Sequence, residues 1–158
     1  EMDGVEYASV EHAYQAAKVL DPAKREVLTL AFNPRLHAGQ AKRIGRNLKP
    51  LREGWDEIKR GIMKELLVKK FNQPRFQEKL LATGDAELVE GNWWHDTFFG
   101  VCMGVQNGHV CRFGPHEPVG ENVLGQLLME VRSEIRQQRG TSASEPTLVS
   151  QHASPPEE

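Results

Sequence analysis

The chain has 158 residues, of which 39% are hydrophobic and 27% are charged, and its formal net charge at pH 7 is −2. This composition excludes a wholly disordered chain, and the length predicts a single domain with a substantial core. No apolar run reaches the ~20 residues of a membrane helix and no signal-peptide pattern opens the chain, so no membrane partner is expected. Two cysteines, Cys102 and Cys111, do not make a disulfide framework, which favours a reducing, cytoplasmic location.

The last 19 residues, 140–158, differ in composition from the rest of the chain. They contain three glutamates, no lysine or arginine, and only two large aliphatic residues. Such a segment buries too little apolar surface to offset its conformational entropy, so we expect a disordered tail. Residues 1–139 then form the folded domain, with a net charge of +1. That charge is too small for DNA binding by bulk electrostatics, so any phosphate contact must come from a local cluster.

The N-terminal half is predicted to be helical. Ser9 is a suitable N-cap for a helix over 10–20. The pairs Asp21-Pro22 and Asn33-Pro34 each predict the start of a further helix, because a polar cap precedes a proline in the first turn. Apolar residues at helical spacing predict a long helix over 52–71.

The C-terminal half mixes helix and strand signals. Pro74 opens a short helix that ends near Gly84, and strand signals cover 86–90 and 97–113. Asn107-Gly108 is typical of a type I′ turn and predicts a β-hairpin. A final helix with one apolar face is expected over 121–138. The fold class is therefore α+β, mainly α-helical, with a few short strands and a hairpin in one compact domain.

The first predicted helix carries a polar face. Glu11, Gln15 and Lys18 follow one another at helical spacing, opposite an apolar face that contains Tyr14. One interpretation is a solvated polar stripe. The other is a carboxylate, an amide and an amine that face a cleft. Periodicity alone does not decide between the two.

A basic cluster follows, with a glycine inside it. Gly45 could let the backbone approach a phosphate, or the cluster could be an ordinary charged surface. Its members are Lys42, Arg43, Arg46, Lys49 and Arg52, with Lys59 further on.

Two more segments are candidates for ligand binding. Trp93, Trp94, Phe98 and Phe99 surround Asp96, an arrangement that suits a planar base above a sugar, although aromatic side chains of a strand also fill cores. The segment GENVLG, residues 120–125, could bring backbone close to a ligand or could simply cap a helix.

A metal site is not expected from the sequence. Cys102, His109, Cys111 and His116 lie within fifteen residues, but their spacing matches no zinc motif. The predicted hairpin register also leaves the two cysteines out of direct opposition.

Seven segments, in this order, resemble the NADAR family, also called YbiA-like N-glycosidases. They span residues 6–132 and comprise EYASVEHAYQAAK (6–18), Gly45-Arg46, WDEIKRGIM (55–63), KFNQ (70–73), LLATGDAELVE (80–90), DTFFG (96–100) and GENVLGQLLMEVR (120–132).

The resemblance implies a compact, mostly helical fold. It also implies cleavage of an N-glycosidic bond between a ribose-phosphate or ADP-ribose unit and a base-like amine, with no cofactor. Two substrate classes are associated with the family. One comprises phosphoribosylamino-pyrimidine intermediates of riboflavin biosynthesis, and the other comprises ADP-ribosylated guanine in nucleic acid.

The resemblance also assigns site residues. Glu11, Asp96 and Trp55 are the expected catalytic residues. One carboxylate would stabilise a ribosyl cation and the other would activate water, and which does which stays open. Residues expected to bind substrate are Gln15, Lys18, Gly45, Arg46, Lys59, Phe99, Gly100, Asn122 and Gly125.

Within that set, Trp55 and Phe99 would flank the base, and Lys18, Arg46 and Lys59 would bind phosphate.

Two departures from the family pattern leave an alternative open. Phe99 stands where the family often has tryptophan, and the strand that usually precedes the first helix is absent. If that strand lines the pocket, we expect the chain to be a fragment with reduced or no activity. The alternative function is a module that binds ADP-ribose or a nucleotide without cleaving it.

Overall fold

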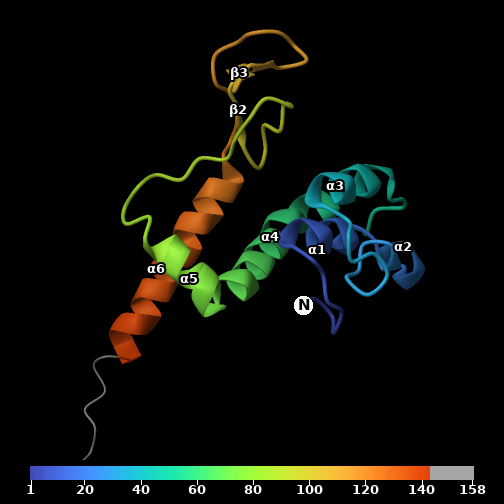
Figure 1. The fold of residues 1–158 in the computed structure, drawn as a ribbon, viewed down its shortest axis with the longest axis horizontal. Helices are drawn as coiled ribbons and strands as arrows, with labels where there is room; N and C mark the ends of the chain where they lie inside the picture. The colour runs from blue at the N-terminus through green and yellow to red at the C-terminus, as the bar shows by residue number, and fades with distance from the viewer. Residues whose placement is uncertain (143–158) are drawn as a thin grey trace, which may run out of the picture.

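The structure, a computed structural model, describes residues 1–142, in which six helices and four two-residue strands form (Figure 1). The helices are α1 (Val10–Ala17), α2 (Pro22–Glu26), α3 (Ala38–Asn47), α4 (Trp55–Phe71), α5 (Pro74–Leu81) and α6 (Val123–Ser142). The strands are β1 (Gly91–Asn92), β2 (Val101–Cys102), β3 (Val105–Gln106) and β4 (His109–Val110). The predicted fold class, α+β and mainly helical, is confirmed.

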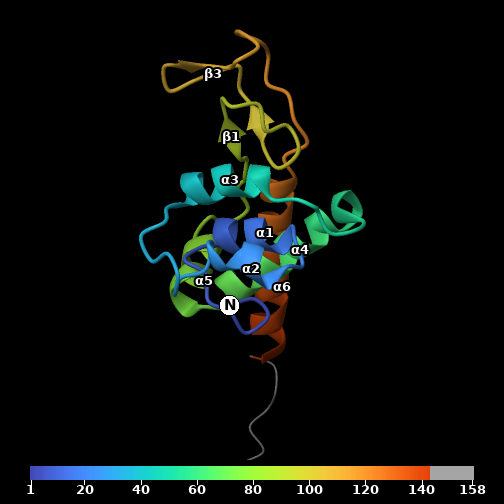
Figure 2. The same ribbon diagram turned by 90° about the vertical axis from the view of Figure 1, so that its right-hand side faces the viewer.

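The helices pack around α4. It contacts α1 on one side and α5 and α6 on the other, and α3 covers α1. In both views the strands and their loops lie beyond the N-terminal end of α6, away from the N-terminus of the chain (Figures 1 and 2). The main core joins α1, α4, α5 and α6 through residues such as Tyr14, Trp55, Leu66 and Leu127. Fully burying each large apolar side chain contributes roughly 1.5–3 kcal/mol.

The first two helices begin where the sequence predicts. The Ser9 hydroxyl accepts a hydrogen bond from the His12 amide at the start of α1. Asp21 accepts from the Ala23 amide at 3.0 Å, and Pro22 occupies the first turn of α2. Both starts are encoded locally, which is why cap residues alone locate them.

The helix predicted at Asn33-Pro34 is wrong. The chain makes turns there, and α3 begins four residues later at Ala38. His37 and Gln40 form a reciprocal capping box at this start, with an imidazole nitrogen as the acceptor. Histidine is not among the preferred capping residues, so the true start carries a weak sequence signal.

The strand predicted over 86–90 is also wrong. Instead, the Asn122 side chain holds this segment, because it donates to the Leu88 carbonyl and accepts from the Glu90 amide. The hairpin at Asn107-Gly108 is confirmed, with Val105 opposite Val110 and positive φ at both turn residues. β1 and β2 form a separate parallel pair.

The predicted boundary between domain and tail falls inside a helix. α6 continues beyond Arg139 to Ser142, and the rest of the predicted tail lies outside the described residues. No helix in the described part of the chain has the length and apolarity that a bilayer crossing requires.

Candidate active site

The polar face of α1 turns toward α3, so it is not a solvated stripe. Gln15 is only 3% exposed, and its amide donates to the Glu11 carboxylate at 2.6 Å. A Cβ atom on Gly45 would overlap the Gln15 amide and lie 2.8 Å from its Cβ. Gly45 therefore permits close packing of α3 on α1, and the Lys18 ammonium donates to its carbonyl at 3.4 Å. Glu11, Gln15, Lys18 and Gly45 meet as one group.

The basic cluster acts on Lys18 across this contact. Burial has the largest effect and lowers the pKa of Lys18, whereas the Glu11 carboxylate raises this pKa. The nearby cations Lys42, Arg46 and Lys49 lower the pKa further. The positive charges of this cluster are therefore close enough to act on Lys18. Such a concentration of cations favours an anionic ligand.

Asp96 is held by a hydrogen-bonded loop. Asn92, which is fully buried, donates to the Asp96 carbonyl at 2.8 Å and accepts from its amide at 3.0 Å. One carboxylate oxygen accepts from the Phe99 amide at 3.1 Å, and the other accepts from the Lys42 ammonium at 3.2 Å. The carboxylate is thus fixed between the loop and α3 while its side chain keeps 25% exposure.

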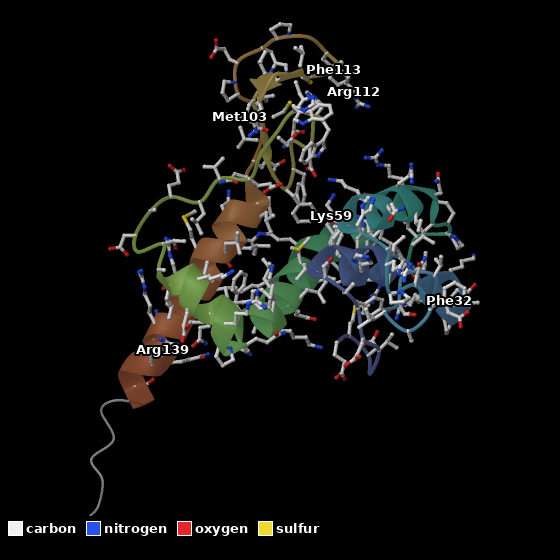
Figure 3. The ribbon with its side chains drawn as sticks, in the orientation of Figure 1. Phe32, Lys59, Met103, Arg112, Phe113 and Arg139 are labelled. Carbon is white, nitrogen blue, oxygen red and sulfur yellow. The ribbon has the colours of Figure 1, made fainter. Side chains whose placement is uncertain are left out.

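A cavity of about 650 Å³ lies beside this carboxylate. Its lining combines cations, aromatic rings and one acid: Lys42, Arg46, Trp93, Trp94, His95, Asp96, Thr97, Phe98 and Arg112. Lys42 also lies over the Trp94 ring, at 5.3 Å from its centre. Figure 3 shows Arg112 beside Phe113 on the segment beyond the helices. The lining suits a ligand that carries phosphate and a planar base.

The predicted aromatic pair occupies a different position. Trp55 is 8% exposed and packs in the core against Tyr14, with the ring centres 5.3 Å apart. Phe99 also contacts the Tyr14 ring, in an edge-on arrangement, and Phe98 is the ring that reaches the cavity. The position of Trp55 therefore supports a packing role, and Trp94 and Phe98 are better placed to stack on a base.

Lys59 lies at the edge of the same aromatic group, beneath the loop that carries Phe98 (Figure 3). Its ammonium is 4.3 Å from the centre of the Phe98 ring and 2.7 Å from the Asp56 carboxylate. Tyr14 lies between the acids: burial raises the pKa of its hydroxyl, and Glu11, Asp96 and Asp56 raise it further. The Tyr14 hydroxyl therefore stays protonated at neutral pH.

Glu90 is a third carboxylate that the sequence analysis missed. Burial raises its pKa, Lys42 opposes the shift, and Asp96 and Glu11 raise the pKa further. Glu90, Glu11 and Asp96 are therefore close enough to interact electrostatically, although only Asp96 lines the cavity. The only sequence signal for Glu90 is its place at the end of LLATGDAELVE, one of the segments that resemble the family. Because residues 86–90 were predicted to form a strand, Glu90 was not considered as a site residue.

Three predicted ligand residues support the Glu90 backbone instead of facing the cavity. A Cβ on Gly100 would overlap the Glu90 carbonyl, and one on Gly125 would overlap the Leu88 carbonyl. Asn122 has a φ of 55° and bonds both Leu88 and Glu90. Direct substrate contact by these residues stays a prediction.

The structure brings together a cysteine and histidine cluster that the spacing along the sequence did not reveal. One ligand atom from each of His95, Cys102, Cys111 and His116 lies within 4.8 Å of all the others. His109 is not a member, since its ring stacks on Trp93 with centres 4.5 Å apart. Cys102 leaves the hairpin register and pairs with Val119, a contact that spacing within the hairpin cannot reveal.

Comparison with known proteins shows that this chain is similar to proteins named as N-glycosidases. Residues 1–136 match the NADAR domain. N-glycosidase YbiA of Escherichia coli is 35% identical over 136 residues, covering 85% of this chain and 74% of that protein. An N-glycosidase of Nostoc punctiforme is 37% identical over 136 residues, covering 82% and 75%.

Two further comparisons concern a longer protein and a solved structure. The chloroplastic riboflavin biosynthesis protein PYRR of Zea mays is 33% identical over 141 residues, which are 82% of this chain and 20% of that protein. The NMR structure of E. coli YbiA superposes with a TM-score of 0.68 at 32% identity, covering 94% of this chain and 77% of that one.

Proposed function

The chain belongs to the NADAR domain family, and from this premise we propose that it is an N-glycosidase. It is a hydrolase that cleaves the bond between C1′ of a phosphate-bearing ribose and the nitrogen of a base-like amine. The observation that carries the proposal is the Asp96 carboxylate, fixed beside a cavity that also presents Lys42, Arg46 and aromatic rings.

Different groups of lining residues suit the phosphate and the base of such a substrate. Lys42, Arg46 and Arg112 supply charge-assisted donors for phosphate oxygens. Trp94 and Phe98 offer flat surfaces to a base. A volume of about 650 Å³ falls within the range typical of small-molecule sites.

The reaction passes through a ribosyl cation with charge on C1′ and the ring oxygen. A carboxylate close to that centre stabilises the charge, and a second one takes a proton from the attacking water. Asp96 and Glu11 share these two roles. The leaving nitrogen also needs a proton. We assign this proton to Glu90, which lies outside the cavity lining, because its raised pKa makes it a better match for a general acid than an exposed glutamate. The oxygen of the attacking water forms a bond to C1′, the bond between C1′ and the nitrogen breaks, and the base departs as a neutral amine.

Two classes of substrate are compatible with this reaction and with the cavity. One is a free phosphoribosylamino-pyrimidine, and the other is ADP-ribose attached to guanine in a nucleic acid strand. Both place a phosphate-bearing ribose on a base-like amine. The cationic lining serves either one, and a single modified base in a flexible strand needs few further contacts.

The experiment incubates the chain with each substrate class and identifies the products by chromatography and mass detection. Glu11→Gln is the test variant, since it keeps an oxygen to accept from Gln15 and removes only the charge. We expect a loss of about 10²–10⁴-fold in kcat. Glu65→Gln, at an exposed position of α4, is the matched control and retains activity.

The products separate the candidates. Release of ADP-ribose from the modified strand, or of ribose phosphate from the phosphoribosylamino-pyrimidine, supports the N-glycosidase and identifies its substrate class. Tight binding of either substrate without any release, by a folded chain, would contradict it and would favour the non-catalytic binding module. Equal kcat in Glu11→Gln and Glu65→Gln would remove Glu11 from the reaction.

A further inference from the structure

We propose that His95, Cys102, Cys111 and His116 bind one zinc ion that stabilises the segment beyond the helices. Their ligand atoms lie within 4.8 Å of one another, and two sulfur–nitrogen pairs, Cys102–His116 and Cys111–His95, are 3.5 Å apart. In a tetrahedral zinc site the ligand bond lengths give edges of about 3.5 Å for S···N and about 3.8 Å for S···S. The cluster therefore has nearly the dimensions of a zinc site.

The His116 ring is oriented as a metal ligand. Its Nδ1 lies 2.7 Å from the Glu117 carbonyl oxygen, which can only accept, so Nδ1 carries the hydrogen. The lone pair of Nε2 then points to Cys102 Sγ, at 3.5 Å. A backbone carbonyl that fixes the tautomer of a ligating histidine is a common feature of zinc sites.

The backbone is shaped around the cluster. His95 has a φ of 66°, a conformation that a non-glycine residue adopts only when its surroundings impose it. Gly104 has a φ of 67°, and a Cβ there would lie 2.6 Å from the His116 amide nitrogen. Cys111 donates to the Gly104 carbonyl at 2.7 Å, and Cys102 exchanges two backbone hydrogen bonds with Val119. Three separate stretches thus converge on the four ligands.

This segment has almost no apolar core of its own. Within residues 101–119 the buried positions are Cys102, Gly104 and Cys111, whereas Val105, Val110 and Phe113 are exposed. Strands of two residues are not stable alone in water, and small units of this kind usually need a disulfide or a metal. Because the segment also carries Arg112, the ion would fix one wall of the cavity.

The donor set favours zinc in a structural role. Two thiolates and two imidazoles suit a tetrahedral zinc ion, and four protein ligands leave no open position for substrate. A disulfide would use only the two sulfur atoms and would give the histidines no role. The ion would therefore take no direct part in the hydrolytic reaction, although its ligand His95 lies in the wall of the cavity.

The test measures metal in the full chain, purified without a metal-affinity tag. Elemental analysis should give about one zinc per chain. After removal of zinc by a chelator, added cobalt(II) should give the visible bands of a tetrahedral ion and a thiolate charge-transfer band. Cys111→Ser should lose most of the zinc, and His116→Cys should keep it, because a thiolate replaces the imidazole.

His109→Ala is the matched control, since His109 lies on the same segment outside the cluster. It should bind zinc as the parent chain does, and its helical circular dichroism should be unchanged. A folded parent chain that retains no zinc and binds cobalt(II) without tetrahedral bands would overturn the proposal. So would an intact-mass measurement that shows a Cys102–Cys111 disulfide in chain purified under reducing conditions.

Discussion

Single residues decide how closely α1 and α3 approach, and Gly45 is the tightest of these positions. Gly45→Ala places a methyl group against the buried Gln15 side chain, so we expect a loss of about 1–3 kcal/mol in the free energy of unfolding. Gly61→Ala is the control, because a Cβ there meets nothing within 4 Å and the helix gains up to about 1 kcal/mol. Urea denaturation of both variants measures the difference. A Gly45→Ala variant as stable as the parent would contradict the packing of α3 on α1.

We expect Glu90 to aid catalysis and its ionised carboxylate to lower the stability of the fold at neutral pH. Its raised pKa means that its protonated form contributes stability below the unfolded pKa, and this stability is lost as the pH rises through the folded pKa. Glu90→Gln should therefore keep or raise the Tm at about pH 7, with the difference vanishing at about pH 4. Its kcat should fall about 10²–10⁴-fold, as expected for a lost general acid.

Thermal unfolding at both pH values, together with pH–rate profiles, tests this assignment. The parent chain should lose activity as the pH rises through the pKa of Glu90, and the variant should lack that limb. A lower Tm at neutral pH with an unchanged kcat would show that the Glu90 carboxylate only supports the structure.

At this scale, sequence reasoning singled out residues that the structure places in or near the candidate site. Glu11, Asp96 and Arg46 stood out because charged side chains share a helix face or follow aromatic residues. Glu90 did not, since its pKa depends on burial and on Asp96 and Glu11, which α1 and a distant loop bring close. The family resemblance assigned Trp55 to the catalytic residues, but tertiary packing places it against Tyr14 in the core.

At the scale of elements, Asn122 joins the start of α6 to the Leu88–Glu90 segment. Asn122→Ala removes two hydrogen bonds and places alanine, which tolerates positive φ less well than asparagine, at this position. We expect the free energy of unfolding to fall by about 2–4 kcal/mol. Asn122→Asp keeps the acceptor for the Glu90 amide and should lose less.

Guanidinium denaturation of Asn122→Ala and Asn122→Asp, with Asn122→Gly as a third variant, separates the two causes. Glycine relieves the positive φ but makes neither bond, so it should fall between the parent and alanine. Equal stability of all three variants and the parent would show that this link contributes nothing.

The elements that could be predicted were those with local signals. Ser9, Asp21-Pro22 and Asn107-Gly108 each encode a cap or a turn within a few residues, and the structure has a helix start or hairpin at each. The 86–90 segment has the composition of a strand but finds its hydrogen-bond partner in Asn122, 32 residues beyond Glu90. No pattern of spacing near Glu90 carries that information.

At the scale of the whole molecule, both helices and loops contribute residues to the candidate site. α1, α3 and α4 hold Glu11, Lys42 and Lys59, while Glu90 and Asp96 come from irregular segments held against them. The mainly helical fold was predictable from periodicity. The cavity and the cysteine and histidine cluster were not, because both depend on how separate loops meet.

The most direct test of the central claim is hydrolysis in water labelled with ¹⁸O, followed by mass analysis of both products. Attack on C1′ predicts that the label appears in the released sugar and that the base is released as an unlabelled amine. Label in the base, or intact substrate after prolonged incubation with folded chain, would contradict N-glycosidic cleavage by this site.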